Sequence, residues 1–191
     1  MTGAADPGHG LHAIVLAAGA SSRFGSPKQL VRVAGRPLLH TAVARAAEVA
    51  GAAVIVVLGA RAAELAPLLK HSQSSVVVNR DWREGLASSI RTGVARLPAS
   101  CTAVLLTLVD QAAVTAEDLK RLVNAWRRQP GYIAAARYGT TTGVPAIGFV
   151  YLVMVLSFCS VDRFGRDRQS PSAARSGAGA RNRTRLEAGL R

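Results

Sequence analysis

The sequence is poor in cysteine and in aromatic residues. Only Cys101 and Cys159 occur in 191 residues, far apart and without a CxxC pair. A disulfide scaffold or a cysteine-based zinc site is therefore not expected, and a reducing cytoplasm is the default location. Aromatic residues make up 5% of the chain, and no basic run is interleaved with them. In spite of a net charge of +13, we expect no specific nucleic-acid partner.

We expect neither a secretory signal nor a membrane-spanning helix. Residues 1–10 lack the basic and apolar regions of a secretory signal. The apolar stretch from Ile147 to Cys159 is 13 residues long, short of the roughly 20 needed to span a bilayer. We interpret it as a buried strand.

What the chain does have, up to about residue 150, is an alternation of short β-branched runs and amphipathic helical patterns. Strands are predicted at 12–17, 53–58, 75–79, 102–109, 132–137 and 145–150, and helices at 37–50, 61–69, 86–97 and from Thr115, with Asp118 as capping partner. Continuous apolar runs such as AVIVVL fit strands that are covered on both faces. The alternation predicts one α/β domain over residues 11–150, with a doubly wound, mostly parallel sheet.

The stretch LAAGASSRFGSPKQL, residues 16–30, follows the first predicted strand, where ligands of parallel sheets bind. Its small side chains let backbone N–H groups approach an anion, and Arg23 and Lys28 add two positive charges. A P-loop is excluded because five residues separate Gly19 from Gly25 and Gln29 follows Lys28. No GxGxxG fingerprint is present either. A Gly-Ala loop taken alone is better interpreted as an ordinary βα loop whose cations are solvated.

This stretch resembles the signature loop of the MobA-like nucleotidyltransferases, L-A-[AG]-G-x-S-x-R-[MF]-G-x-x-K, and is most similar to that of the molybdenum cofactor cytidylyltransferases. The resemblance implies a Rossmann-like fold of the nucleotide-diphospho-sugar transferase type, and Mg²⁺-dependent transfer from a nucleoside triphosphate to an acceptor phosphate with release of pyrophosphate. Gly19 to Ser22 would cradle the phosphates, while Arg23 and Lys28 would stabilise charge during transfer. The implied nucleotide-binding residues are Leu16, Ala17, Ala18, Gly19, Ala20, Ser21, Ser22, Arg23 and Lys28. LAAG in place of the guanylyl branch's LAGG favours CTP.

A second element, residues 79–91, resembles the family's N-x-x-W-x-x-G-[ML]-x-x-S-[LI]-R segment. By that resemblance Asn79, Gly85, Ser88 and Ser89 help to hold the nucleotide. Hydroxyls and free N–H groups at a helix start suit an anion or a base edge, although a serine there is more often a plain N-cap. Trp82 is interpreted as a packing residue.

Two further elements complete the resemblance over residues 11–148. Asp110 directly follows a buried strand and, by the family's L-x-D-[QM]-P element, would bind Mg²⁺, with Gln111 beside it facing the acceptor. Ala112 stands where the family has proline. Gly143 and Pro145 match the family's G-x-P segment, which also faces the acceptor, the molybdopterin cofactor.

The resemblance ends near Phe149. A later acidic element, expected to complete the metal site opposite Asp110, is not found, and residues 151–191 are rich in Arg, Ser, Gly and Ala without lysine. We expect this tail to be largely disordered. We hypothesise that it is a frameshifted or replaced segment. Reading the gene in its other frames tests this, and finding no family-like continuation there would refute it.

Three classes of function remain open. The leading one is an enzyme that transfers CMP from CTP to the molybdenum cofactor, whose product could serve a molybdoenzyme of the xanthine dehydrogenase type; a nucleotidyltransferase acting on a sugar or polyol phosphate is its close variant. The second is a non-catalytic protein that binds and delivers nucleotide or cofactor. The third is a basic binder of nucleic acid or a membrane surface through the Arg-rich tail.

Overall fold

A computed structural model describes residues 10–21, 25–151 and 153, and it confirms the α/β fold. Six strands form one sheet in the order β5-β4-β1-β6-β8-β7. The strands of this sheet are β1 (Leu11–Ala17), β4 (Val54–Leu58), β5 (Ser75–Val78), β6 (Ala103–Leu108), β7 (Ala134–Tyr138) and β8 (Thr141–Phe149). The α-helices are α1 (Leu38–Ala50), α2 (Ala62–Leu65), α3 (Leu86–Val94) and α4 (Ala116–Arg128).

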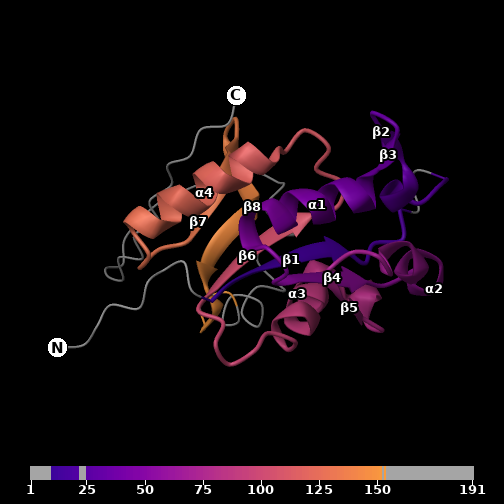
Figure 1. Ribbon diagram of the computed structural model, residues 1–191, viewed down its shortest axis with the longest axis horizontal. Helices are drawn as coiled ribbons and strands as arrows, with labels where there is room; N and C mark the ends of the chain where they lie inside the picture. Colours follow the sequence, from indigo (N-terminus) through magenta and orange to yellow (C-terminus); the bar gives the residue numbers. More distant parts are fainter. Residues whose placement is uncertain (1–9, 22–24, 152, 154–191) are drawn as a thin grey trace, which may run out of the picture.

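The sheet has a parallel half and an antiparallel half. β5, β4, β1 and β6 run parallel. In chain order, β1, β4, β5 and β6 are each joined to the next by a crossover that contains a helix, as parallel neighbours require. β7 and β8 form a hairpin, and β8 pairs antiparallel with β6. The carboxyl ends of β1 and β6 therefore meet at one edge of the sheet, next to each other (Figure 1).

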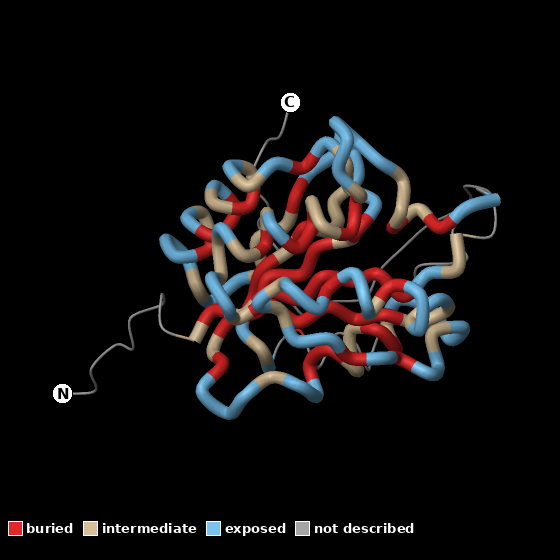
Figure 2. The backbone as a smooth tube through the Cα atoms, turned by 45° about the vertical axis from the view of Figure 1, so that its right-hand side comes forward, coloured by how far each residue is buried: buried red, intermediate tan, exposed pale blue. Residues whose placement is uncertain are grey.

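Alternate residues of the central strands pack against opposite layers of helices. Ala13, Val15 and Ala17 of β1 join α1 and α4 in one core, and Ile14 and Leu16 join α3 in the other. Figure 1 shows α1 and α4 on one side of the sheet and α3 on the other. The central strands are almost entirely buried, whereas the outer surfaces of the helices are exposed (Figure 2). This double cover explains the continuous apolar runs in the sequence.

Several predicted boundaries are wrong by a few residues. Pro37 precedes α1 instead of forming its first turn, because it pairs with Arg32 in a short hairpin, β2 (Arg32–Val33) with β3 (Arg36–Pro37), that we did not predict. The helix predicted at 61–69 is divided into α2 and a 3₁₀ helix, η2 (Ala66–Leu69), with Pro67 in its first turn. The predicted capping box of Thr115 and Asp118 is confirmed at the start of α4.

The largest difference lies near the end of the described chain. β8 begins at Thr141, earlier than predicted, and ends at Phe149 because its partner β6 begins at Ala103. Val150 and Tyr151 are helical, so the strand predicted for Ile147–Cys159 stops after three residues. Residue 152 and residues 154–191, including Cys159, lie outside the described part. No helix among the described residues has the length and apolarity needed to cross a membrane.

Helix α3 packs close to the sheet because a glycine faces it. A Cβ atom at Gly93 would lie 2.9 Å from Ile14 Cγ2 and 3.1 Å from Val57 Cγ2. These distances are shorter than ordinary carbon contacts, so a side chain at this position would push α3 away from β1 and β4.

We therefore expect Gly93→Val to lower the free energy of unfolding by about 1–3 kcal/mol, the usual cost of overpacking a core. Urea unfolding followed by circular dichroism measures this. Gly131→Val is the matched control, because Gly131 is exposed and has no neighbour within 4 Å of an added Cβ atom. Equal midpoints for the two variants would contradict the expectation.

Candidate active site

Nine of the predicted site residues meet at a pocket of about 290 Å³ beyond the carboxyl ends of β1 and β6. Its walls come from the loop after β1, the loop after β6 and the start of α3. The lining residues are Leu16, Ala17, Ala18, Gly19, Ser21, Lys28, Gln29, Trp82, Gly85, Leu86, Ser89, Leu108, Val109 and Asp110. Segments that are far apart in the sequence thus form one site, as the positions of the motifs predicted.

The predicted catalytic cation and the predicted metal ligand face each other in this pocket. Lys28 Nζ lies 3.2 Å from Asp110 Oδ2, and the two side chains are 36% and 41% exposed. A salt bridge with this much solvent contributes little to stability, so incoming charged groups can separate it at low cost. The pocket therefore offers an ammonium group for phosphate and a carboxylate for a cation at one place.

The loop after β1 contributes most of the predicted nucleotide-binding residues. Leu16 to Gly19 and Ser21 line the pocket, whereas Ala20 belongs to the same loop but does not line it. Ser22 and Arg23 lie outside the described residues, so their roles stay predictions. Gln29, to which we assigned no role, also lines the pocket. Its partners are two backbone carbonyls and one hydroxyl of the loop, which no local sequence pattern reveals.

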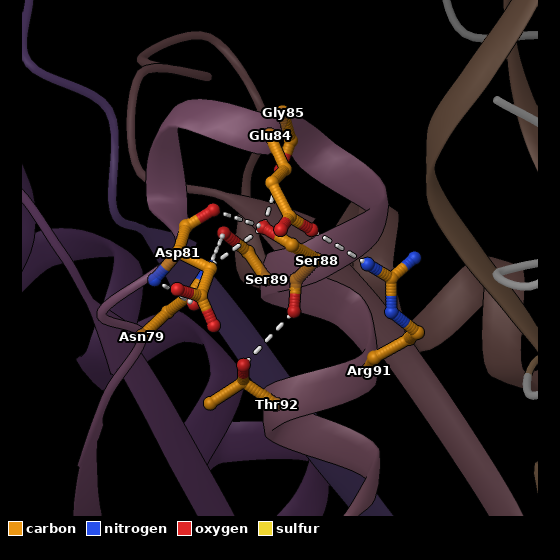
Figure 3. Close-up of polar contacts among 8 residues, drawn as sticks. All are labelled: Asn79, Asp81, Glu84, Gly85, Ser88, Ser89, Arg91 and Thr92. Atoms are coloured by element: carbon orange, nitrogen blue, oxygen red, sulfur yellow. Dashed lines mark hydrogen bonds and ion pairs between the residues drawn. The ribbon is translucent and has the colours of Figure 1, made fainter.

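Asn79 and Ser88, predicted to hold the nucleotide, do not line the pocket. They belong to a buried hydrogen-bond network (Figure 3). Asn79 Nδ2 donates to Ser88 Oγ at 2.8 Å and to Ser89 Oγ at 3.1 Å, and its Oδ1 accepts from the backbone N–H of Asp81. Ser88 Oγ donates to the backbone carbonyls of Asp81 and Gly85. The network fastens the end of β5 to the first turn of α3, where Gly85 and Ser89 reach the pocket.

Gln111, predicted to face the acceptor, forms hydrogen bonds within the protein through both the oxygen and the nitrogen of its carboxamide. Oε1 accepts from Leu108 N and Thr107 Oγ1, and Nε2 donates to Tyr138 Oη and to the Val144 carbonyl. Gly143 and Pro145 flank Val144, so this carboxamide ties the loop after β6 to the predicted acceptor segment on β8. Burial, followed by the nearby Asp118 carboxylate, raises the pKa of Tyr138, whose neutral hydroxyl donates to the Val144 carbonyl.

The turn after Asp110 is held although Ala112 replaces the family's proline. Arg45 of α1 donates from Nη1 to the Ala112 carbonyl at 3.1 Å and to the Gln111 carbonyl at 3.4 Å. Arg45, more than sixty residues earlier in the chain, therefore holds the backbone of this turn in place. This role was not predicted from the sequence.

No group of three or more His, Cys, Asp or Glu residues able to hold a metal occurs in the part of the chain that the structure describes. Asp110 is thus the carboxylate available in the pocket, among described residues, for a cation that also binds phosphate oxygens. Mg²⁺ is commonly held in this way, by one or two carboxylates together with substrate phosphates, and the residues present fit it. Cys101 is unrelated to the pocket: it is buried, and burial raises the pKa of its thiol.

A family model, the MobA-like NTP transferase domain, matches residues 13–169. The chain belongs to this family. The predicted membership of the MobA-like nucleotidyltransferases is thereby confirmed, and the chain carries a nucleotidyltransferase domain. The match extends about twenty residues beyond Phe149, where the motif resemblance ends.

Similar proteins of known name include the nicotine blue oxidoreductase of Paenarthrobacter nicotinovorans. It is 36% identical over 129 residues, which is 66% of this chain and 61% of that protein. The bifunctional protein GlmU of Anaeromyxobacter dehalogenans (strain 2CP-1 / ATCC BAA-258) is 34% identical over 132 residues, or 27% of its length. The chain thus spans less than two thirds of the length of these relatives.

Among solved structures, Rv0371c of Mycobacterium tuberculosis H37Rv is 29% identical, with a TM-score of 0.64 over 78% of this chain and 75% of that one. The same protein has been solved in complex with manganese, with a TM-score of 0.62 over 77% of this chain and 74% of that one. This chain therefore shares its fold with these solved structures.

The Asn79 network leads to a stability prediction. Asn79→Ala removes two donors and one acceptor from a buried cluster, so we expect the free energy of unfolding to fall by about 2–4 kcal/mol. Asn124→Ala is the control, because Asn124 is exposed on α4. Chemical denaturation of both variants measures the difference, and a loss at Asn79 no larger than at Asn124 would mean that the network does not support α3.

Proposed function

We propose that this protein is a Mg²⁺-dependent nucleotidyltransferase that transfers CMP from CTP to the molybdopterin form of the molybdenum cofactor. The observation that carries the proposal is the Lys28–Asp110 pair in a pocket walled by the small-residue loop after β1. One group attracts the triphosphate and the other attracts the cation that accompanies it.

In this reaction an oxygen of the acceptor phosphate attacks the α-phosphorus of CTP in line. The bond from the α-phosphorus to the bridging oxygen breaks, and pyrophosphate leaves. Lys28 binds the phosphates and stabilises the charge on the departing group, and the loop after β1 orients the chain of phosphates. Mg²⁺, when bound at Asp110, neutralises phosphate charge.

The acceptor is assigned to the side of the pocket formed by the loop after β6. Gln111 holds this loop against Gly143–Pro145, so the two predicted acceptor elements are one connected unit. The LAAG form of the first loop supports CTP over GTP. We propose that the product passes to a molybdoenzyme. The relative of 36% identity is named an oxidoreductase, and this name is in keeping with a redox enzyme as the recipient.

The polar side chains that line the pocket include an ammonium, a carboxylate, a carboxamide and hydroxyls. These groups suit a triphosphate with its cation.

The first test is a thermal melt of the purified chain with Mg²⁺ and CTP, GTP or ATP in turn, followed by an assay of pyrophosphate release with the cofactor as acceptor. We expect CTP to raise the melting temperature most. Lys28→Met and Asp110→Asn should each lower the transfer rate by roughly 10²–10³-fold, because each removes charge stabilisation in the transition state.

Lys70→Met is the control, since Lys70 is exposed after η2, outside the pocket lining. A larger shift with GTP or ATP would overturn the choice of CTP. Binding of CTP without pyrophosphate release would favour the non-catalytic delivery protein, and release only with a sugar or polyol phosphate would replace the acceptor.

A further inference from the structure

Gln29 has no part in the proposal above, yet its side chain is one of the most deeply buried polar groups of the described chain. The residue is 2% exposed and lies in a short 3₁₀ helix, η1 (Lys28–Leu30), directly after Lys28. A buried carboxamide must find its hydrogen-bond partners inside the protein. Where those partners lie therefore shows what the side chain does.

The Gln29 side chain is hydrogen-bonded to three residues of the loop that follows β1. Nε2 donates to the carbonyls of Ala17 and Gly19, each at 2.9 Å. Oε1 accepts from Ser21 Oγ at 3.4 Å. One side chain thus bonds three alternate residues of the loop, eight to twelve positions earlier in the chain.

These bonds set the directions of the peptide groups in the loop. In a trans peptide the carbonyl and the N–H point in opposite directions. Fixing the carbonyls of Ala17 and Gly19 therefore also fixes the N–H groups of Ala18, which lines the pocket, and of Ala20, which follows it in the same loop. Backbone N–H groups are what a loop of small residues has to offer to phosphate oxygens.

Ser21 is held from the same side. Its φ of 54° lies in the left-handed region, which a residue other than glycine adopts at a cost of about 1–3 kcal/mol. Its hydroxyl accepts from the backbone N–H of Lys28 at 3.1 Å and donates to Gln29. Residues 28 and 29 thus compensate a strained conformation in the loop, and the same bonds fix the backbone from which the Lys28 side chain extends.

We infer that Gln29 is a positioning residue that holds the phosphate-binding loop in its binding shape before the nucleotide arrives. The inference rests on the proposed function and deepens it. Gln29 acts on the part of the ligand that the loop binds, the phosphates, and not on the base or on the acceptor. Binding is tighter when a loop is ordered in advance, because the ligand does not have to order it.

The test compares Gln29→Met with the wild type. Methionine has a similar length and flexibility but cannot donate to the two carbonyls. By calorimetry with Mg²⁺ present, we expect the Kd values for CTP and for pyrophosphate to rise together, roughly tenfold. The ratio of CTP to GTP affinity and the KM for the acceptor should not change. Gln29→Glu should bind more weakly than Gln29→Met, because a carboxylate faces the same carbonyls.

Gln73→Met is the matched control, since Gln73 is exposed in the loop before β5 and lines no part of the site. A purely structural role would lower the melting temperature and leave the Kd of the folded fraction unchanged, which overturns the inference. Changed CTP to GTP discrimination would also overturn it. A wild type that binds neither nucleotide nor pyrophosphate would refute the proposed function and this inference together.

If Gln29→Met does not unfold cooperatively, Ser21→Gly is a second variant that tests the same hydrogen bonds of the loop. Glycine adopts the left-handed conformation without strain but lacks the hydroxyl that links Ser21 to Gln29 and Lys28. We expect a Kd for pyrophosphate several-fold above that of the wild type, in line with the loss of about one hydrogen bond. An unchanged Kd would count against the inference.

Discussion

The pairing of β1 between β4 and β6 is the constraint on which the rest of the structure depends. β1 is parallel to both neighbours and buried on both faces, so its register fixes the two layers of helices at once. The same register places the end of β1 beside the end of β6. A slip by one residue would exchange the two faces of the strand, and the pocket would be lost together with the core.

The pocket then has two supports of different kind. On the parallel side, Gln29 and the Asn79 network hold the loop after β1 and the start of α3 through buried carboxamides. On the antiparallel side, Gln111 ties the end of β6 to β8, and Arg45 holds the adjoining turn from α1. On both sides, the side chains that line the pocket are short or flexible. The backbone that carries them is fixed by a carboxamide or guanidinium group from elsewhere in the chain. The charged groups of the site are thus exposed, whereas the supporting carboxamides of Gln29 and Asn79 are buried.

The sequence predicted those parts that depend on local pattern. The apolar runs predicted the central strands, and Thr115 with Asp118 predicted the start of α4, because period and capping are local properties. The motifs predicted that Lys28 and Asp110 would share one edge. The supports could not be predicted in this way. The partners of Gln29, Arg45 and Gln111 are mostly backbone carbonyls brought close only by folding, and the β2–β3 hairpin is too short to give a period.

The antiparallel direction of β8 has a geometric consequence for the chain that follows it. Phe149 pairs with Ala103 at the amino end of β6 and contacts Trp126 of α4 edge to face, with ring centroids 5.4 Å apart. Asp110 lies beyond the other end of β6. The six residues of that strand measure roughly 20 Å at about 3.3 Å per residue. For a later carboxylate to share a cation with Asp110, the chain after Phe149 would have to run back along the full length of β6. This path takes about six extended residues or about 13 helical ones.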